Sequence, residues 1–202
     1  LFSNTQIENP NLMLEGMPNY RSGVDGLRVS NSTKGGITFA ASTTQNGIHM
    51  ITVVLGVEAV DGDPYARFVA TSSLMNYVVR TFVSSIVVKE GDPYGKSKAT
   101  VMDGKSETVL AVAKKDFYIV EKQGSQAEPK IQFKSDQESF RAPVKSGTNL
   151  GKLYYTDPDK IGRGYLEDQE PTVDMVAGRT IEKSFFLKVW WNEFVRYVNE
   201  KL

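Results

Sequence analysis

The sequence has no cysteine and only one histidine among its 202 residues. Disulfides, thiolate nucleophiles and thiolate metal sites are therefore excluded, and one histidine cannot build a histidine-rich metal site. Lysine plus arginine and aspartate plus glutamate both total 24, so the formal net charge is +0. This balance removes the electrostatic basis for a general nucleic-acid binder. We therefore expect no cofactor, no metal and no nucleic-acid partner.

Long apolar runs are also missing. No uninterrupted run approaches the roughly 18 residues that a membrane span needs, and no basic segment followed by an apolar one opens the chain as a signal peptide would. The first residue is Leu1 and not methionine, which we interpret as the start of a processed or excised fragment. With 40% hydrophobic residues, the chain is apolar enough to form one large domain or two small ones.

The first pattern that is present is a β-hairpin followed by a helix. The runs Ile37 to Thr43 and Ile48 to Val57 flank Asn46-Gly47, a dipeptide typical of two-residue hairpin turns. Asp63 as N-cap and Pro64 at the first helical position then predict a helix start. Apolar residues recur after this start at helical spacing: Phe68, Met75, Val78, Val79 and Phe82. We therefore expect the helix to cover one face of the hairpin.

Short β-rich runs separated by turn residues follow from residue 84. The runs read SSIVVKE, ATVM, TVLAVA, DFYIVEK, KIQFK, KLYYT and TVDMVA, with GDPYG and DGK between the first three as turns. Strands at this spacing are typical of a sandwich or a barrel-like domain. The pattern predicts a small all-β domain over residues 84–178.

The last segment, residues 179–202, predicts an amphipathic helix. Successive residues placed about 100° apart gather its large apolar side chains on one broad face. These side chains are Phe186, Leu187, Trp190, Trp191, Phe194, Val195, Tyr197, Val198 and Leu202. Either the β-rich domain covers this face, as in most soluble proteins, or the helix lies in the plane of a membrane interface. The residues alone leave both interpretations open.

Residues 1–83 resemble the end of the transpeptidase-like domain of low-molecular-weight penicillin-binding proteins of the D-alanyl-D-alanine carboxypeptidase type. The resemblance rests on NTQIENPNLML before GVDGL, on the hairpin and on PYARFVATSSLMNYV. Family members of this kind continue with a β domain and an amphipathic helix that holds them on the outer face of the cytoplasmic membrane. FFLKVWWNEFVRYVNEKL is similar to the streptococcal members.

This resemblance implies an α+β fold in three parts. Residues 1–83 would form the end of a β-lactamase-like domain with a strand, the hairpin and the closing helix. Residues 84–178 would form a sandwich-like β domain, and residues 179–202 a membrane-interface helix.

The catalytic motifs of this family are absent or altered here. The family uses Ser-x-x-Lys, Ser-x-Asn and Lys-Thr-Gly, yet no serine in the chain has a lysine three residues on or an asparagine two residues on. Where Lys-Thr-Gly should follow Leu27, the sequence reads Arg28-Val29-Ser30. A guanidinium cannot replace an ammonium that sheds a proton, valine lacks the hydroxyl, and the serine side chain obstructs close approach to the strand. We expect the strand without its catalytic edge.

Other polar patterns favour structural roles. Lys145-Ser146-Gly147 matches a looser Lys-Ser/Thr-Gly motif, but no hairpin and closing helix follow it, so we expect a turn. His49 has no serine and carboxylate pattern around it, which favours a surface or packing role. The pairs Asp61–Asp63 and Asp157–Asp159 lie in Gly/Pro-rich turns without EF-hand spacing, so we expect no metal there.

The resemblance implies a role in peptidoglycan metabolism at the extracellular face of a Gram-positive-like cytoplasmic membrane. We expect this chain to be inactive by itself and to act as a membrane-apposed spacer and anchor. The membrane-binding residues would be Phe186, Leu187, Trp190, Trp191, Phe194, Val195 and Val198. Two alternatives stay open. The chain is an active carboxypeptidase on a peptidoglycan peptide once a preceding segment supplies the nucleophile, or it is a non-enzymatic module whose helix binds a partner protein.

Overall fold

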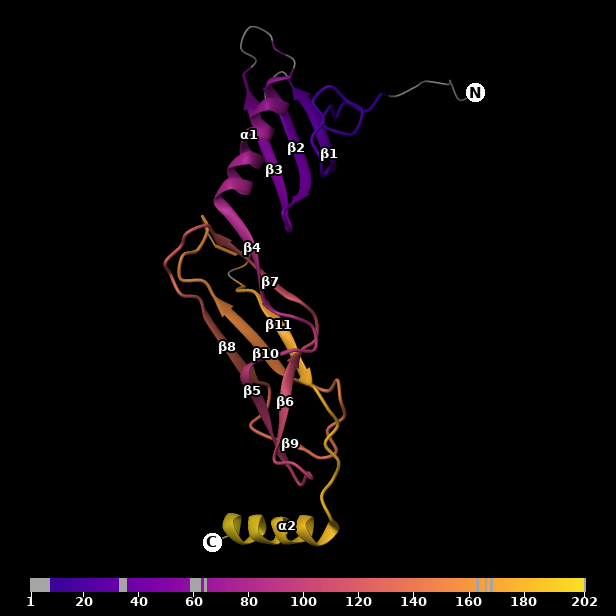
Figure 1. Ribbon diagram of the computed structural model, residues 1–202, viewed down its shortest axis with the longest axis vertical. Coiled ribbons are helices and arrows are strands. Elements are labelled where there is room, and N and C mark those ends of the chain that lie inside the picture. Colours follow the sequence, from indigo (N-terminus) through magenta and orange to yellow (C-terminus); the bar gives the residue numbers. More distant parts are fainter. Residues whose placement is uncertain are drawn as a thin grey trace, which may run out of the picture. The chain divides into compact units, whose positions relative to one another are not determined.

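The computed structural model describes residues 8–32, 36–58, 63, 65–162, 164–165, 167 and 169–201. In this part of the chain, three strands and a helix are followed by eight strands and a second helix (Figure 1). The chain divides into two compact units, Leu1–Ser84 with Val120–Gly124, and Ser85–Ile119 with Ser125–Leu202. Each unit has its own cluster of buried apolar side chains.

The first unit contains a three-stranded antiparallel sheet in the order β1-β2-β3. Its strands are β1 (Val24–Ser32), β2 (Gly36–Gln45) and β3 (Ile48–Val57). Asn46 and Gly47 join β2 to β3 with φ values of 52° and 75°. Positive φ at both central residues is the requirement of a type I′ turn, whose twist matches that of the strands. The predicted hairpin is confirmed.

Helix α1 (Ala66–Thr81) packs against β2 and β3 (Figure 1). Phe68 meets Phe39 edge to face, with 5.1 Å between ring centroids, and Met75 is fully buried beside them. The prediction was wrong at both ends of this helix. It begins at Ala66, and Asp63 accepts a hydrogen bond from the Tyr65 amide at 2.8 Å; Pro64 lies outside the described residues. Phe82 is extended and begins the next strand.

The second unit is mostly β-sheet. Its larger sheet has the order β8-β10-β11-β6-β5-β9, and β4 pairs with β7 in a two-stranded sheet (Figure 1). The strands are β4 (Phe82–Val88), β5 (Pro93–Met102), β6 (Thr108–Ala113), β7 (Phe117–Lys122), β8 (Lys130–Ser135), β9 (Phe140–Arg141), β10 (Asn149–Thr156) and β11 (Thr172–Ala177). All pairings described in the six-stranded sheet are antiparallel except β5 with β9.

Alternation of buried and exposed side chains explains why these runs form strands. Leu150, Leu153 and Tyr155 of β10 are buried, as are Val173 and Met175 of β11. These residues share one core with side chains of β4 and β7: Val88, Phe117 and Ile119. Period-two burial is the pattern expected for a sheet with one face in a core and one in solvent.

Two details of the β-rich part differ from the sequence prediction. Pro93–Gly95 was expected in a turn but belongs to β5, whose pairing with β6 shifts register between Pro93 and Lys98. Such an irregularity lets a strand accommodate residues that normally favour turns. Strand β9 was missed because a two-residue parallel pairing leaves no period-two signal in the sequence.

Helix α2 spans Phe186–Lys201, shorter than the predicted 179–202. The residues before it are extended because they pair with the β-rich unit: Ile181 bridges Val144, and Lys183 bridges Gly104. Ile181 is only 4% exposed. Burial of this side chain and its backbone pairing therefore override the helical periodicity of the sequence.

Candidate functional site

The residues at the expected Lys-Thr-Gly position lie in the middle of β1. Arg28 is paired with Ala40, Val29 with Phe39 and Ser30 with Thr38. Arg28 and Ser30 are exposed, whereas Val29 is half-buried and packs against the core of the unit. Within the part of the chain that the structure describes, β1 pairs with β2 alone, so its second edge has no strand partner.

Arg67 of α1 fastens the end of this strand from the interior. Its Nη1 donates to the carbonyls of Ser30 at 3.3 Å and Thr38 at 3.2 Å, and its Nη2 donates to the Asn31 side chain. Arg67 is only 6% exposed, and this burial lowers its pKa. The planar guanidinium thus holds β1, β2 and α1 together through neutral oxygen atoms.

The chemistry open to this edge is binding rather than proton transfer. Arg28 presents a guanidinium, which donates hydrogen bonds and attracts carboxylates but stays protonated in proteins. An exposed strand edge can also add an extended peptide through backbone hydrogen bonds. Ser30 keeps its carbonyl occupied by Arg67 and by the Thr38 hydroxyl at 3.1 Å.

The outer face of β3 is a feature that the sequence analysis missed. Ile51, Val53 and Leu55 are 63%, 55% and 74% exposed, while the alternate residues Met50 and Val54 are buried. The signal was present in the sequence as the nearly unbroken apolar run of β3, since strands buried on both faces are apolar at every position. The described residues of the first unit leave this apolar face uncovered.

Helix α2 exposes the aromatic side chains that were predicted to bind a membrane. Exposed fractions are 67% for Phe186, 56% for Leu187, 62% for Trp190, 59% for Trp191, 49% for Phe194 and 38% for Val195, and Val198 is half-buried. The rings also contact one another, with centroids 6.1 Å apart for Trp190 and Phe194 and 6.0 Å for Trp191 and Phe194. Contiguous exposed apolar side chains mark a surface that another phase or molecule covers.

The described helices do not include one that is long and apolar enough to cross a membrane. The exposed rings of α2 therefore belong to a helix of another kind, with a binding face along its side.

The other polar patterns have structural partners. His49 is exposed on β3. Ser146 and Gly147 form a turn, in which Gly147 has a φ of 83° and the Thr148 amide donates to the Lys145 carbonyl at 3.1 Å. This part of the prediction is confirmed.

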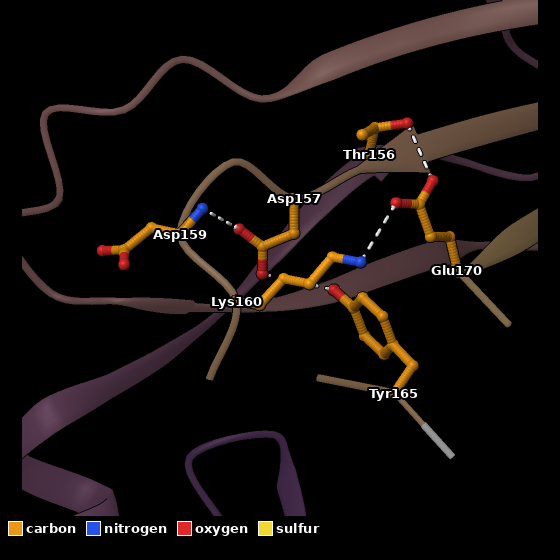
Figure 2. Close-up of polar contacts among 6 residues, drawn as sticks. All are labelled: Thr156, Asp157, Asp159, Lys160, Tyr165 and Glu170. Atoms are coloured by element: carbon orange, nitrogen blue, oxygen red, sulfur yellow. Dashed lines mark hydrogen bonds and ion pairs between the residues drawn. The ribbon is translucent and has the colours of Figure 1, made fainter. Parts of the chain in front are cut away.

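The loop after β10 shows how its carboxylates are used (Figure 2). Asp157 accepts hydrogen bonds from the Asp159 amide at 2.8 Å and the Tyr165 hydroxyl at 3.4 Å. Glu170 accepts a hydrogen bond from the Thr156 hydroxyl at 2.8 Å and pairs with Lys160 at 3.7 Å. Asp157 therefore acts as a turn residue. Among the described residues no group of three or more metal-binding side chains was found, and Asp61 lies outside them.

Comparison with known proteins places these features in a family. The family model "Penicillin-binding protein 5, C-terminal domain" matches residues 82–183. Over 133 residues, the chain is 27% identical to the D-alanyl-D-alanine carboxypeptidase DacA of Haemophilus influenzae, covering 65% of this chain and 32% of that protein.

Solved structures give a similar result. A peptidoglycan synthesis regulatory factor (PBP3) from Streptococcus pneumoniae is 45% identical with a TM-score of 0.81, over 87% of this chain and 48% of that one. Penicillin-binding protein 5 from Haemophilus influenzae shares the fold at 23% identity and a TM-score of 0.55, over 80% of this chain and 43% of that one.

The chain thus spans between about a third and a half of the length of these relatives. The family model alone matches half of it, residues 82–183. The chain therefore belongs to the D-alanyl-D-alanine carboxypeptidase-type penicillin-binding proteins, whose C-terminal domain it contains.

Proposed function

We propose that this chain is the membrane-apposed spacer and anchor of a carboxypeptidase-type penicillin-binding protein of peptidoglycan metabolism. It would act at the extracellular face of a Gram-positive-like cytoplasmic membrane. The observation that carries the proposal is the aromatic face of α2, where Trp190 and Trp191 are 62% and 59% exposed. Tryptophan, phenylalanine and leucine on one side of a helix are typical of helices that lie in the membrane interface.

Insertion of this face supplies the binding free energy. Each large apolar side chain contributes up to roughly 1.5–3 kcal/mol when fully buried, and less at the shallow depth of an interfacial helix. Acidic and basic residues are nearly balanced along residues 179–202. We therefore expect that anionic lipid helps only modestly and that added salt weakens binding little.

The segment before α2 links the helix firmly to the β-rich unit. The Lys105 amide donates to the Glu182 carbonyl at 2.9 Å, and the Ser184 amide donates to the Asp103 carbonyl at 2.8 Å. Pairing therefore continues to the last residues before the helix. A spacer needs such a connection, because slack between the anchor and the domain would leave the domain free to tumble at the membrane.

Vesicle flotation tests the proposal. We expect the full chain to float with phosphatidylcholine vesicles, and the variant Trp190→Ala with Trp191→Ala to stay in solution. The matched control is Tyr118→Ala, which removes an aromatic side chain of β7 that is 57% exposed. Neutralising Lys188 and Arg196 should have a smaller effect than removing the two tryptophans.

The β-rich unit should stay folded in the double-tryptophan variant, with an unchanged thermal melting curve. A chain that never floats contradicts the membrane anchor. In that case, loss of the folded β unit in the variant would make α2 a core element. Capture of a single protein by α2 without vesicle binding would favour the partner-binding module.

A second candidate function is an active carboxypeptidase completed by a preceding catalytic segment. The observation that favours it is the uncovered apolar face of β3, formed by Ile51, Val53 and Leu55. A packed domain rarely leaves such a face in water, so a further layer over the sheet is the physical expectation. The relatives are two to three times as long as the part that this chain matches, which leaves room for such a layer.

Fusion of the catalytic half of the streptococcal relative in front of this chain tests the second candidate. Acylation by penicillin in the fusion, seen as a mass increase, would support it and overturn the inactive role. Val53→Asp should then abolish labelling, whereas Leu110→Asp, on an exposed residue of β6, should not. No labelling with Arg28-Val29-Ser30 in place, but labelling after restoration of Lys-Thr-Gly, would support the inactive spacer.

A further inference from the structure

A row of like charges crosses the outer face of the six-stranded sheet. Lys134 of β8 lies directly opposite Lys152 of β10, and Lys152 lies opposite Asp174 of β11. Lys114, just after β6, pairs with Asp174 at 3.6 Å. Three lysines and one aspartate, here named the lysine row, therefore run across the strands at the spacing of neighbouring strands, about 4.8 Å each.

The lysine row is unfavourable in the free protein. Like charges directly opposite on neighbouring strands destabilise a sheet. Asp174 is already paired with Lys114, and the chain as a whole has a formal net charge of +0. Positive charge concentrated in one row of a neutral protein points to an anion that neutralises it.

Two adjoining hollows lie beside the lysine row. One, of about 410 Å³, is lined by Lys152, Tyr154, Gln169, Glu170 and Thr172. The other, of about 280 Å³, is lined by Lys114, Lys115, Thr172 and Asp174. Both include Thr172 of β11, so together they form one elongated groove across the sheet.

The groove is prepared for an anion rather than a cation. Both carboxylates in its lining are already paired, Asp174 with Lys114 and Glu170 with Lys160 and the Thr156 hydroxyl. Lys134 lies over the ring of Tyr154, with its Nζ 5.0 Å from the ring centroid. This contact holds an aromatic surface and an ammonium group side by side at one end of the groove.

We propose that this groove binds an anionic polysaccharide. The lysines would pair with the regularly spaced acidic groups of the polymer. The side chains of Gln169 and Thr172 offer hydrogen bonds to sugar hydroxyls, and Tyr154 offers an apolar surface to a sugar ring. An acidic peptide fits less well, since peptides bind sheets through the backbone groups of an edge strand. The groove lies on the face of the sheet and presents side chains.

Titration of the full chain with defined polymers tests the proposal. The probes are muramic-acid-containing glycan strands without peptides, which carry carboxylates, and a poly(glycerol phosphate), which carries phosphates. A neutral chito-oligosaccharide and polyglutamate are the comparison ligands. We expect at least one anionic glycan polymer or polyol phosphate to bind, with an affinity that falls as salt rises. The stronger of the two identifies the acidic group.

Two variants locate the binding. Lys134→Glu and Lys152→Glu should each weaken binding about tenfold or more, equivalent to about 1.4 kcal/mol. The matched control is Lys98→Glu, an exposed lysine of β5 in the same sheet, paired across to Leu110; it should change affinity less than twofold.

Four outcomes would overturn the proposal. These are absence of binding to both anionic polymers, equal binding of the neutral oligosaccharide, tighter binding of polyglutamate, and an equal loss in Lys98→Glu. The last would show diffuse attraction by surface charge in place of a site. Binding with an intact fold that only the groove variants lose would support it, whether or not α2 binds vesicles.

Discussion

At the scale of single residues, Gly151 is the glycine whose place in the sheet is most demanding. It has a φ of 148°, and an added Cβ would lie 2.1 Å from the carbonyl oxygen of Lys134 on the neighbouring strand. The β10–β11 register also shifts between Asn149 and Gly151. The close approach of two backbones therefore requires glycine at this position.

We predict that Gly151→Ala destabilises the β-rich unit by about 2–3 kcal/mol, because a backbone carbonyl cannot move aside as a flexible side chain does. Urea unfolding measures the change. The matched control is Gly124→Ala, which has a φ of 74° and open space around the added Cβ; strain alone should cost it about 1 kcal/mol. Equal losses in the two variants would contradict the clash.

At the scale of elements, β1, β2 and α1 meet at Arg67. Its guanidinium reaches the carbonyls of Ser30 and Thr38 and the side chain of Asn31. A lysine would keep the charge, but a single ammonium on a linear stem cannot match the fixed fork of donors. The position thus tests geometry separately from charge.

We predict that Arg67→Lys destabilises the three-stranded sheet by about 1–3 kcal/mol, because buried acceptors lose partners while the cost of burying a charge remains. Amide hydrogen exchange in β1 to β3 should speed up, with β10 and β11 unchanged as internal reference. Arg80→Lys, at an exposed position of the same helix, is the control. Unchanged exchange in Arg67→Lys would show that the charge alone holds these elements together.

At the scale of the whole chain, strand β1 and the β-rich unit are present without a serine nucleophile in a family motif. An oriented binding strand has no covalent chemistry without a nucleophile and its activating base. Catalysis by this chain alone is therefore limited by what it lacks elsewhere, and not by Arg28-Val29-Ser30 only.

We predict that the chain alone forms no covalent adduct with penicillin, and that Arg28→Lys with Val29→Thr and Ser30→Gly does not change this. Intact mass spectrometry detects a stoichiometric acyl-enzyme, and hydrolysis of a D-alanyl-D-alanine peptide provides a second readout. Activity in the triple variant would reveal a nucleophile that the motifs do not identify.

The sequence by itself determined the features that depend on neighbours along the chain. Asn46-Gly47 fixed the hairpin because its residues adopt positive φ, and period-two patterns located most strands of the β-rich unit. The altered residues at Arg28 to Ser30 could also be read directly. Local backbone preferences and side-chain periodicity suffice for such features.

Only the tertiary structure decided the features that depend on distant residues. Bridges to Val144 and Gly104 made residues before Phe186 extended instead of helical. Strand order brought Lys134, Lys152 and Lys114 into one row. The bare outer face of β3 likewise became visible only once the sheet was assembled. Pairing partners and exposure are set by contacts between segments far apart in sequence, which no local pattern specifies.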